Sequence, residues 1–155
     1  MALTLNPDEY YACLRRDFSS FIERAFRHLN PTTPYLDTWH LDLLAAKLEA
    51  CRQGTIKRLI LCVAPRSLKS HCASVALPAW WLGQDPTAQL LCVSYAQELA
   101  DKHARDCRSL MTSPWYHSVF PQTHLSCQTQ AIEEFMTTRQ GGRSATSVGG
   151  ALTGR

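Results

Sequence analysis

One stretch of this sequence, residues 59–70, constrains the fold more than any other. Residues 59–64 form an apolar run without a charge, and a turn of Pro65, Arg66 and Ser67 ends it. Lys69 and Ser70 follow, and the next residues have helical character. A buried strand, a tight loop with Lys-Ser and a helix form the layout of a phosphate-binding loop, in which backbone amides at a helix N-terminus face an anion. We therefore predict a strand at 59–64 and a phosphate site in the loop after it.

This loop departs from the standard pattern G-x-x-x-x-G-K-[ST], which places glycines where Val63 and Leu68 occur here. The second glycine normally lets the backbone approach a phosphate without a side chain in the way. We therefore expect the Leu68 side chain to point away from the ligand, or the loop to bend differently. The alternative is an ordinary strand-to-helix turn in which Lys69 is a solvated residue.

Two helices are predicted before this stretch. A start of Asn-Pro-Asp-Glu and apolar residues at spacings of three and four predict one long helix over residues 6–29. A second helix is predicted over 39–53, capped by Thr38. Trp39 and His40 at its start either contact a nucleotide base or anchor the helix on the sheet.

The rest of the chain alternates strands and helices. The helix after the loop should end or kink near Pro78, and an apolar strand over 90–94 leads into an amphipathic helix over 97–111. Crossovers of this length predict a parallel sheet in an α/β domain. Weaker strand patterns at 131–138 and 144–148, with glycines between them, predict a hairpin.

Composition excludes several classes of protein. A net charge of +3 does not by itself indicate a nucleic-acid-binding protein. Seven cysteines without a C-x-x-C pair are typical of thiols in a reducing compartment and not of a disulfide framework. The sequence has no signal-peptide pattern, and no apolar run approaches the ~20 residues that span a bilayer. We therefore expect a soluble protein of the cytoplasm.

A series of motifs can be compared with known families. The motifs are Tyr35 with Trp39–Leu43, Arg58–Ile60 with Ala64–Ser70, Pro78–Trp80 with Gly83 and Pro86, Val93–Tyr95 with Glu98–Ala100, Arg105–Arg108, Val119–Pro121 and Ser147–Arg155. In order and spacing they resemble the ATPase half of phage terminase large subunits, the motors that package viral DNA. The resemblance covers nearly the whole chain from about residue 30, and the loop with Leu before Lys-Ser looks like one branch of that family.

The resemblance implies roles for individual residues. Lys69 would bind the β- and γ-phosphates of ATP, and Ser70 would hold Mg²⁺. The backbone of residues 66–68 would cradle the phosphates, and the Arg66 guanidinium would contact the γ-phosphate. Trp39 and His40 match the adenine-side motif of the family. The implied ATP-binding set is Pro65, Arg66, Ser67, Leu68, Lys69, Ser70, Trp39 and His40.

The resemblance also implies a fold and partners. The fold would be an incomplete P-loop NTPase-type parallel sheet flanked by helices, with an N-terminal helical segment over 1–54 and a partial ATPase core over 55–155. The complete protein would work as a homo-oligomer in the host cytoplasm. Its partners would be double-stranded phage DNA, the portal protein and the terminase small subunit.

The resemblance breaks off at the end of the sequence. In the family, the stretch matching Gly149–Arg155 leads into a strand whose final acidic residues hold the metal and orient the attacking water. No such catalytic carboxylate is identified here, and the nuclease half has no counterpart. We expect an N-terminal fragment that is marginally folded, exposes apolar surface and unpaired edges between 59–64 and 90–94, and hydrolyses ATP negligibly. Two alternatives stay open: another P-loop ATPase, such as a helicase-like motor, and a non-catalytic interaction module.

Overall fold

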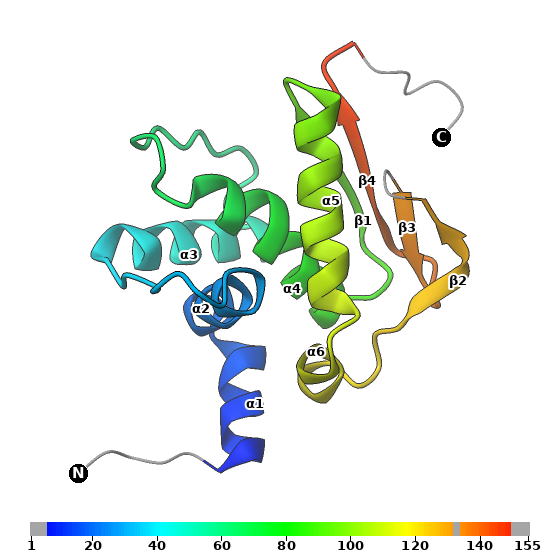
Figure 1. Cartoon of the computed structure of the whole chain (residues 1–155), viewed down its shortest axis with the longest axis horizontal. Coiled ribbons are helices and arrows are strands. Elements are labelled where there is room, and N and C mark those ends of the chain that lie inside the picture. Colours follow the sequence, from blue (N-terminus) through cyan, green and yellow to red (C-terminus); the bar gives the residue numbers. More distant parts are fainter. Residues whose placement is uncertain (1–5, 132–133, 150–155) are drawn as a thin grey trace.

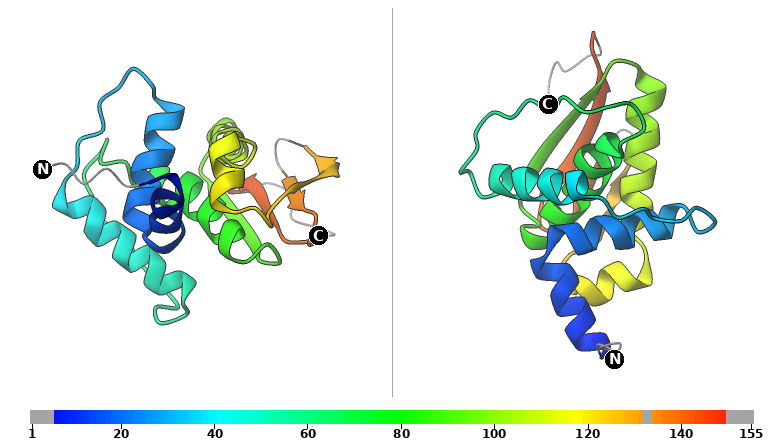
Figure 2. Two further views of the ribbon diagram at one scale, coloured as in Figure 1. Left: turned by 90° about the horizontal axis from the view of Figure 1, so that it is seen from below. Right: turned by 90° about the vertical axis from the view of Figure 1, so that its left-hand side faces the viewer.

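The computed structural model describes residues 6–131 and 134–149 and has an α/β architecture. Figures 1 and 2 show the N-terminal helices on one side, a sheet on the other and a layer of helices between them. No helix in the described ranges is long and apolar enough to cross a membrane. The elements are α1 (Pro7–Arg16), α2 (Phe18–Leu29), α3 (Trp39–Arg52), η1 (His71–Ala76), α4 (Leu77–Gln84), β1 (Gln89–Ser94), α5 (Gln97–Met111), α6 (Pro114–Val119), β2 (Leu125–Gln130), β3 (Glu134–Thr137) and β4 (Gly142–Ser147).

The N-terminal segment forms two helices, so the expectation of one long helix is wrong. The break lies at Asp17, whose backbone is extended with φ −112° and ψ 111°. Its carboxylate accepts a hydrogen bond from the backbone N–H of Ser20 at 2.8 Å, which is a helix N-cap. The predicted helix start at Asn6 is confirmed, because Asn6 and Glu9 form reciprocal capping hydrogen bonds.

One hydrophobic core joins the N-terminal helices to the rest of the protein. Trp80 of α4 is fully buried, and its indole N–H donates to the backbone carbonyl of Leu14 at 3.0 Å. The ring of Phe18 lies 5.0 Å from that of Trp80. Because α2 also contacts η1 and α5, it is held against the elements that follow the loop. The division of the chain between residues 54 and 55 stays a prediction.

The helix after the loop does not end near Pro78, as one alternative of the prediction required, but changes type just before it. Residues His71–Ala76 form the π-helix η1, and the α-helix α4 begins at Leu77. Pro78 has no N–H for the carbonyl four residues earlier, which belongs to Ser74. Instead, the guanidinium of Arg143 in β4 donates to that carbonyl, with Nη2 3.1 Å from the oxygen. The loop helix is therefore tied directly to the sheet.

The sheet is mixed, so the expectation of a parallel sheet holds for one pair of strands only. The strand order is β1-β4-β3-β2. β1 and β4 run parallel, from the pair Gln89 and Gly142 to the pair Ser94 and Ser147, whereas β3 is antiparallel to both β4 and β2. The predicted strand in β1 and hairpin in β3 and β4 are confirmed, whereas β2 was not predicted. Residues 132 and 133 of the first hairpin pattern lie outside the described residues.

The predicted strand at 59–64 is wrong. No strand in the described parts of the chain pairs with these residues. Burial nevertheless alternates along them: Leu59, Leu61 and Val63 pack against the core, whereas Ile60 is 87% exposed. The apolar run therefore forms an extended segment with one face in the core. It lacks the neighbouring strand that would satisfy its backbone hydrogen bonds.

β1 forms an open edge of the sheet, with no strand on its outer side among the described residues. On one face of the sheet, α5 packs its Ala100 and Ala104 against Ala145 of β4. On the other face, Leu91 and Val93 are 55% and 53% exposed. The expected unpaired edge and exposed apolar surface are therefore present at β1.

Candidate functional site

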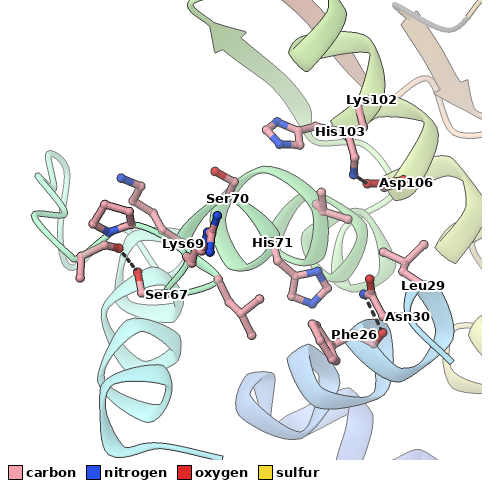
Figure 3. A pocket seen from close by; sticks show the side chains of 15 residues that line it. Phe26, Leu29, Asn30, Ser67, Lys69, Ser70, His71, Lys102, His103 and Asp106 are labelled. Atoms are coloured by element: carbon pink, nitrogen blue, oxygen red, sulfur yellow. Dashed lines mark hydrogen bonds and ion pairs between the residues drawn. The ribbon is translucent and has the colours of Figure 1, made fainter. Parts of the chain in front are cut away.

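A cavity of about 540 Å³ lies beside the residues predicted to bind phosphate. Figure 3 shows that its walls come from three parts of the chain: the loop and the helix start after it, the end of α2, and α5. The lining residues are Ala64–His71 and Val75, then Phe26, Leu29 and Asn30, and finally Lys102, His103 and Asp106. All residues of the predicted loop, Pro65–Ser70, therefore meet at one cavity.

The loop contains two residues in the left-handed backbone region. Arg66 has φ 61° and Leu68 has φ 58°, a conformation that costs a non-glycine residue about 1–2 kcal/mol. The hydroxyl of Ser67 between them donates to the carbonyl of Ala64 at 2.6 Å and closes the turn. Left-handed residues in a turn direct backbone N–H groups into a concavity that binds anions. Strained backbone of this kind is concentrated at ligand sites.

Leu68 occupies the position of the second glycine in the standard pattern. Its side chain packs against the core and also lines the cavity, so the expectation that it points away from the ligand stays a prediction. The backbone of Leu68 has the positive φ that glycine adopts readily. The loop therefore has a glycine-like shape without the glycine.

Lys69 and Ser70 lie where the loop turns into the helix, and both are exposed at the cavity. Lys69 forms no ion pair with any residue that the structure describes. A free ammonium and a hydroxyl at a helix N-terminus suit an anionic ligand, because the helix dipole also favours negative charge there.

Trp39 and His40 do not line this cavity. Trp39 is 77% exposed at the start of α3, and Nδ1 of His40 lies 3.0 Å from the hydroxyl of Thr38. The structure therefore does not bring the two predicted base-contacting residues to the phosphate loop.

The wall formed by α2 is anchored to the loop helix through His71. Its Nε2 lies 3.1 Å from the backbone carbonyl of Ile22, and because a carbonyl only accepts, Nε2 carries the proton. Burial lowers the pKa of His71, so the ring is neutral near pH 7. The ring also meets Phe26 edge-to-face, with centroids 5.7 Å apart. These contacts hold the start of the helix in place relative to α2.

The wall formed by α5 carries charge and a buried imidazole. Nζ of Lys102 lies 2.6 Å from a carboxylate oxygen of Asp106. His103 is 7% exposed, and its Nδ1 is buried without a hydrogen-bond partner. Burial is the main cause that lowers the pKa of His103, and Lys102 and Arg143 lower it further, whereas Asp106 raises it. The ring is therefore neutral near pH 7.

The balance of charge in the cavity favours anions. Three of its lining residues, Arg66, Lys69 and Lys102, are cationic, whereas Asp106 is its one carboxylate and is paired with Lys102. In the described ranges no group of three or more His, Cys, Asp or Glu residues could hold a metal ion. Ser70 supplies a hydroxyl, and none of the described residues that line the cavity adds a carboxylate free of an ion pair. These residues fit Mg²⁺ that arrives bound to phosphate oxygens, because Mg²⁺ keeps several water ligands.

Sequence reasoning found one wall of the cavity and missed the other two. Lys102 and Asp106 are four residues apart, so their pairing on a helix could be read from the sequence. No local pattern indicates that this pair and His103 face the loop, because that depends on how α5 packs against η1.

Comparisons with protein-family models, with curated proteins and with solved structures find no match for this chain.

Proposed function

We propose that this chain binds a nucleoside triphosphate with Mg²⁺ at the loop of residues 65–70. The observation that carries the proposal is the left-handed Leu68, which leads into Lys69 and Ser70 at the edge of a positively charged cavity. A volume of about 540 Å³ suits a small-molecule ligand, since such sites measure roughly 300–1,000 Å³.

Each loop residue has a defined task in this proposal. The amides of residues 66–68 donate to the phosphate oxygens, and the ammonium of Lys69 neutralises the outer phosphates. Ser70 is the protein ligand of the Mg²⁺ that the triphosphate carries. Arg66, exposed at the cavity rim, makes a bidentate contact with the terminal phosphate.

The described residues support binding better than hydrolysis. A P-loop ATPase positions metal and water with a carboxylate. The one carboxylate that lines this cavity, Asp106, is engaged by Lys102 at 2.6 Å. We therefore expect the 155-residue chain to bind ATP and to hydrolyse it negligibly.

At the level of the family, we propose that the chain represents the ATPase part of a phage terminase large subunit. The order and spacing of the motifs support this assignment, and so does the cavity at the loop. The complete protein would then use ATP to move double-stranded phage DNA in the host cytoplasm, as a homo-oligomer bound to the portal protein and the small subunit. The non-catalytic module is the second candidate, and the missing free carboxylate at the cavity favours it for this chain.

The test is isothermal titration of the full 155-residue chain with ATP, with and without Mg²⁺. We expect saturable binding that Lys69→Ala weakens by roughly ten-fold or more, because a charge-assisted phosphate contact is worth about 1.5–3 kcal/mol. Lys47→Ala is the matched control, because Lys47 is an exposed lysine on α3 outside the cavity.

Each result of this titration has a clear meaning. Equal affinity in the wild type and Lys69→Ala would contradict the assigned loop. If the wild type does not bind ATP, the proposed nucleotide site is wrong, and the second candidate, a non-catalytic module that has lost its nucleotide, is favoured. A phosphate-release assay on the same samples measures hydrolysis, and robust Mg²⁺-dependent turnover that Lys69→Ala abolishes would refute the expected lack of activity.

A further inference from the structure

The end of the cavity at α2 carries two hydrogen-bond acceptors that the protein leaves unused. The first is Nδ1 of His71. Nε2 of this ring donates to the backbone carbonyl of Ile22 at 3.1 Å, so Nε2 carries the proton of the neutral ring and Nδ1 keeps its lone pair. Among residues 6–131 and 134–149 Nδ1 has no hydrogen-bond partner, and it is not one of the buried nitrogens that lack one. Because the ring lines the cavity, a ligand can reach this acceptor.

The second acceptor is the side-chain oxygen of Asn30, which follows the last residue of α2. The amide of Asn30 lies 3.1 Å from the backbone carbonyl of Phe26, and because a carbonyl only accepts, the group bonded to it is Nδ2. Oδ1 is therefore left without a donor in the part of the chain that the structure describes, and it is not buried. Asn30 also lines the cavity.

Phe26 brings these two acceptors together. Its ring meets the ring of His71 edge-to-face, with centroids 5.7 Å apart, and its carbonyl accepts the bond from Asn30. Phe26 and Leu29 add apolar surface to the same wall of the cavity. This end of the cavity therefore offers acceptors and apolar surface, whereas the loop offers backbone N–H groups and the positive charge of Lys69.

The two ends of the cavity suit different parts of one ligand. Figure 3 shows Lys69 at one end of the lining residues and Asn30 at the other. A ligand whose phosphates lie at the loop would need an apolar group with N–H donors at α2. A nucleoside base with an exocyclic amino group fits, because it has flat apolar faces and the amino group has two N–H donors, one for each acceptor. A base with a carbonyl at that position would leave both acceptors unpaired, which weakens binding.

We propose that His71 and Asn30 form the base-binding end of this cavity, and that Nδ1 and Oδ1 accept hydrogen bonds from the exocyclic amino group of adenine. This inference rests on the proposed function of the loop. It assigns contact with the base to the end of α2 and the start of η1, in place of Trp39 and His40, which do not line the cavity.

The experiment is a titration of the full chain with three ligands: ATP, inosine triphosphate, which has a carbonyl in place of the amino group, and inorganic tripolyphosphate, which has no base. ATP should bind roughly ten-fold or more tightly than inosine triphosphate, because the carbonyl faces two acceptors. Asn30→Ala removes one acceptor and should reduce this preference to about three-fold or less, with the affinity for tripolyphosphate kept within about two-fold. Gln122→Ala is the control, because Gln122 is an exposed amide outside the cavity and should keep the full preference.

A measurement on the wild type covers the case in which Asn30→Ala disturbs the end of α2. The imidazole nitrogens, labelled with ¹⁵N, should show the Nε2–H tautomer at His71. The Nδ1 resonance of His71 should shift when ATP is added, and should shift less with tripolyphosphate. An Nδ1–H tautomer, or a His71 signal that does not respond to saturating ATP, would overturn the proposal.

The outcomes separate this inference from the function on which it rests. If all three ligands bind, Lys69→Ala weakens each of them and ATP has no preference over inosine triphosphate, then the base-binding end is wrong and the loop assignment stands. A preference that Asn30→Ala keeps in full would also overturn the proposal. If the wild type binds none of the three ligands, the loop assignment itself fails.

Discussion

At the scale of single residues, the backbone angle matters more than the residue type in this protein. Arg66, Leu68 and Gln140 all have positive φ, although none is a glycine. At Leu68 the packing of the side chain against the core accompanies this conformation. A search for glycines in the sequence would therefore miss a loop that has the same shape by other means.

Gln140 allows this strain to be measured away from the cavity. It has φ 67° in the turn between β3 and β4, and its carbonyl accepts a hydrogen bond from the side chain of Gln89, which a substitution would keep. Gln140→Gly should raise the free energy of unfolding by up to about 1 kcal/mol, because glycine adopts this angle without steric cost. Urea denaturation measures the change. Gln140→Val should lower stability, and equal stability of both variants would contradict a strained turn.

At the scale of elements, a side-chain cap marks the start of α1, α2 and α6, whereas Thr38, the expected cap of α3, makes no such hydrogen bond. α2 is a separate helix because Asp17 caps it, with its carboxylate 2.8 Å from the backbone nitrogen of Ser20. Apolar spacing continues through this point without interruption. The periodicity of the sequence therefore cannot show the break.

Removing this cap should weaken the N-terminal region. We expect Asp17→Ala to lower the free energy of unfolding by about 1 kcal/mol, within the range of about 0.5–2 kcal/mol known for helix N-caps. Asp17→Asn should keep most of the stability, because its amide oxygen accepts the same bond. Asp8→Ala is a control in the first turn of α1. Thermal unfolding followed by circular dichroism measures the change. Equal melting temperatures of Asp17→Ala and Asp8→Ala would show that the cap does not stabilise the protein.

The elements that could be predicted from the sequence share one property, which is that their pattern is local. The helix starting at Trp39, the strand β1 and the helix α5 follow from apolar spacing and were found. The strand predicted at 59–64 failed for a different reason. The alternation of Leu59, Leu61 and Val63 toward the core is a local pattern, but a strand forms only when a second strand pairs with it. The loop 65–70 could be located because its pattern is local. The walls of the cavity from α2 and α5 could not, because they depend on how these helices pack.

At the scale of the whole molecule, buried histidines link stability to pH. Burial lowers the pKa of His71 and His103 below the ordinary value of about 6.5. When the pH falls below that value, the two rings take up protons in the unfolded chain more readily than in the folded protein. The unfolded state is therefore favoured by acid, and the free energy of unfolding rises with pH through this window.

We therefore expect the free energy of unfolding to fall as the pH is lowered from about 7 to 5, by at most about 1.4 kcal/mol per pH unit for each histidine. Denaturation by urea at a series of pH values measures it. The slope should be smaller in His103→Gln and unchanged in the exposed control His124→Gln. A stability that stays constant or increases on acidification would contradict the buried, neutral rings.

The outer edge of β1 affects how this protein behaves in concentrated solution. No strand among the described residues pairs with this edge, and Leu91 and Val93 lie exposed beside it. The strand contains neither lysine nor proline, the residues that commonly keep such edges apart. Copies that meet edge to edge can extend one another's sheets. We therefore expect crowding to favour self-association of this chain through the edge of β1.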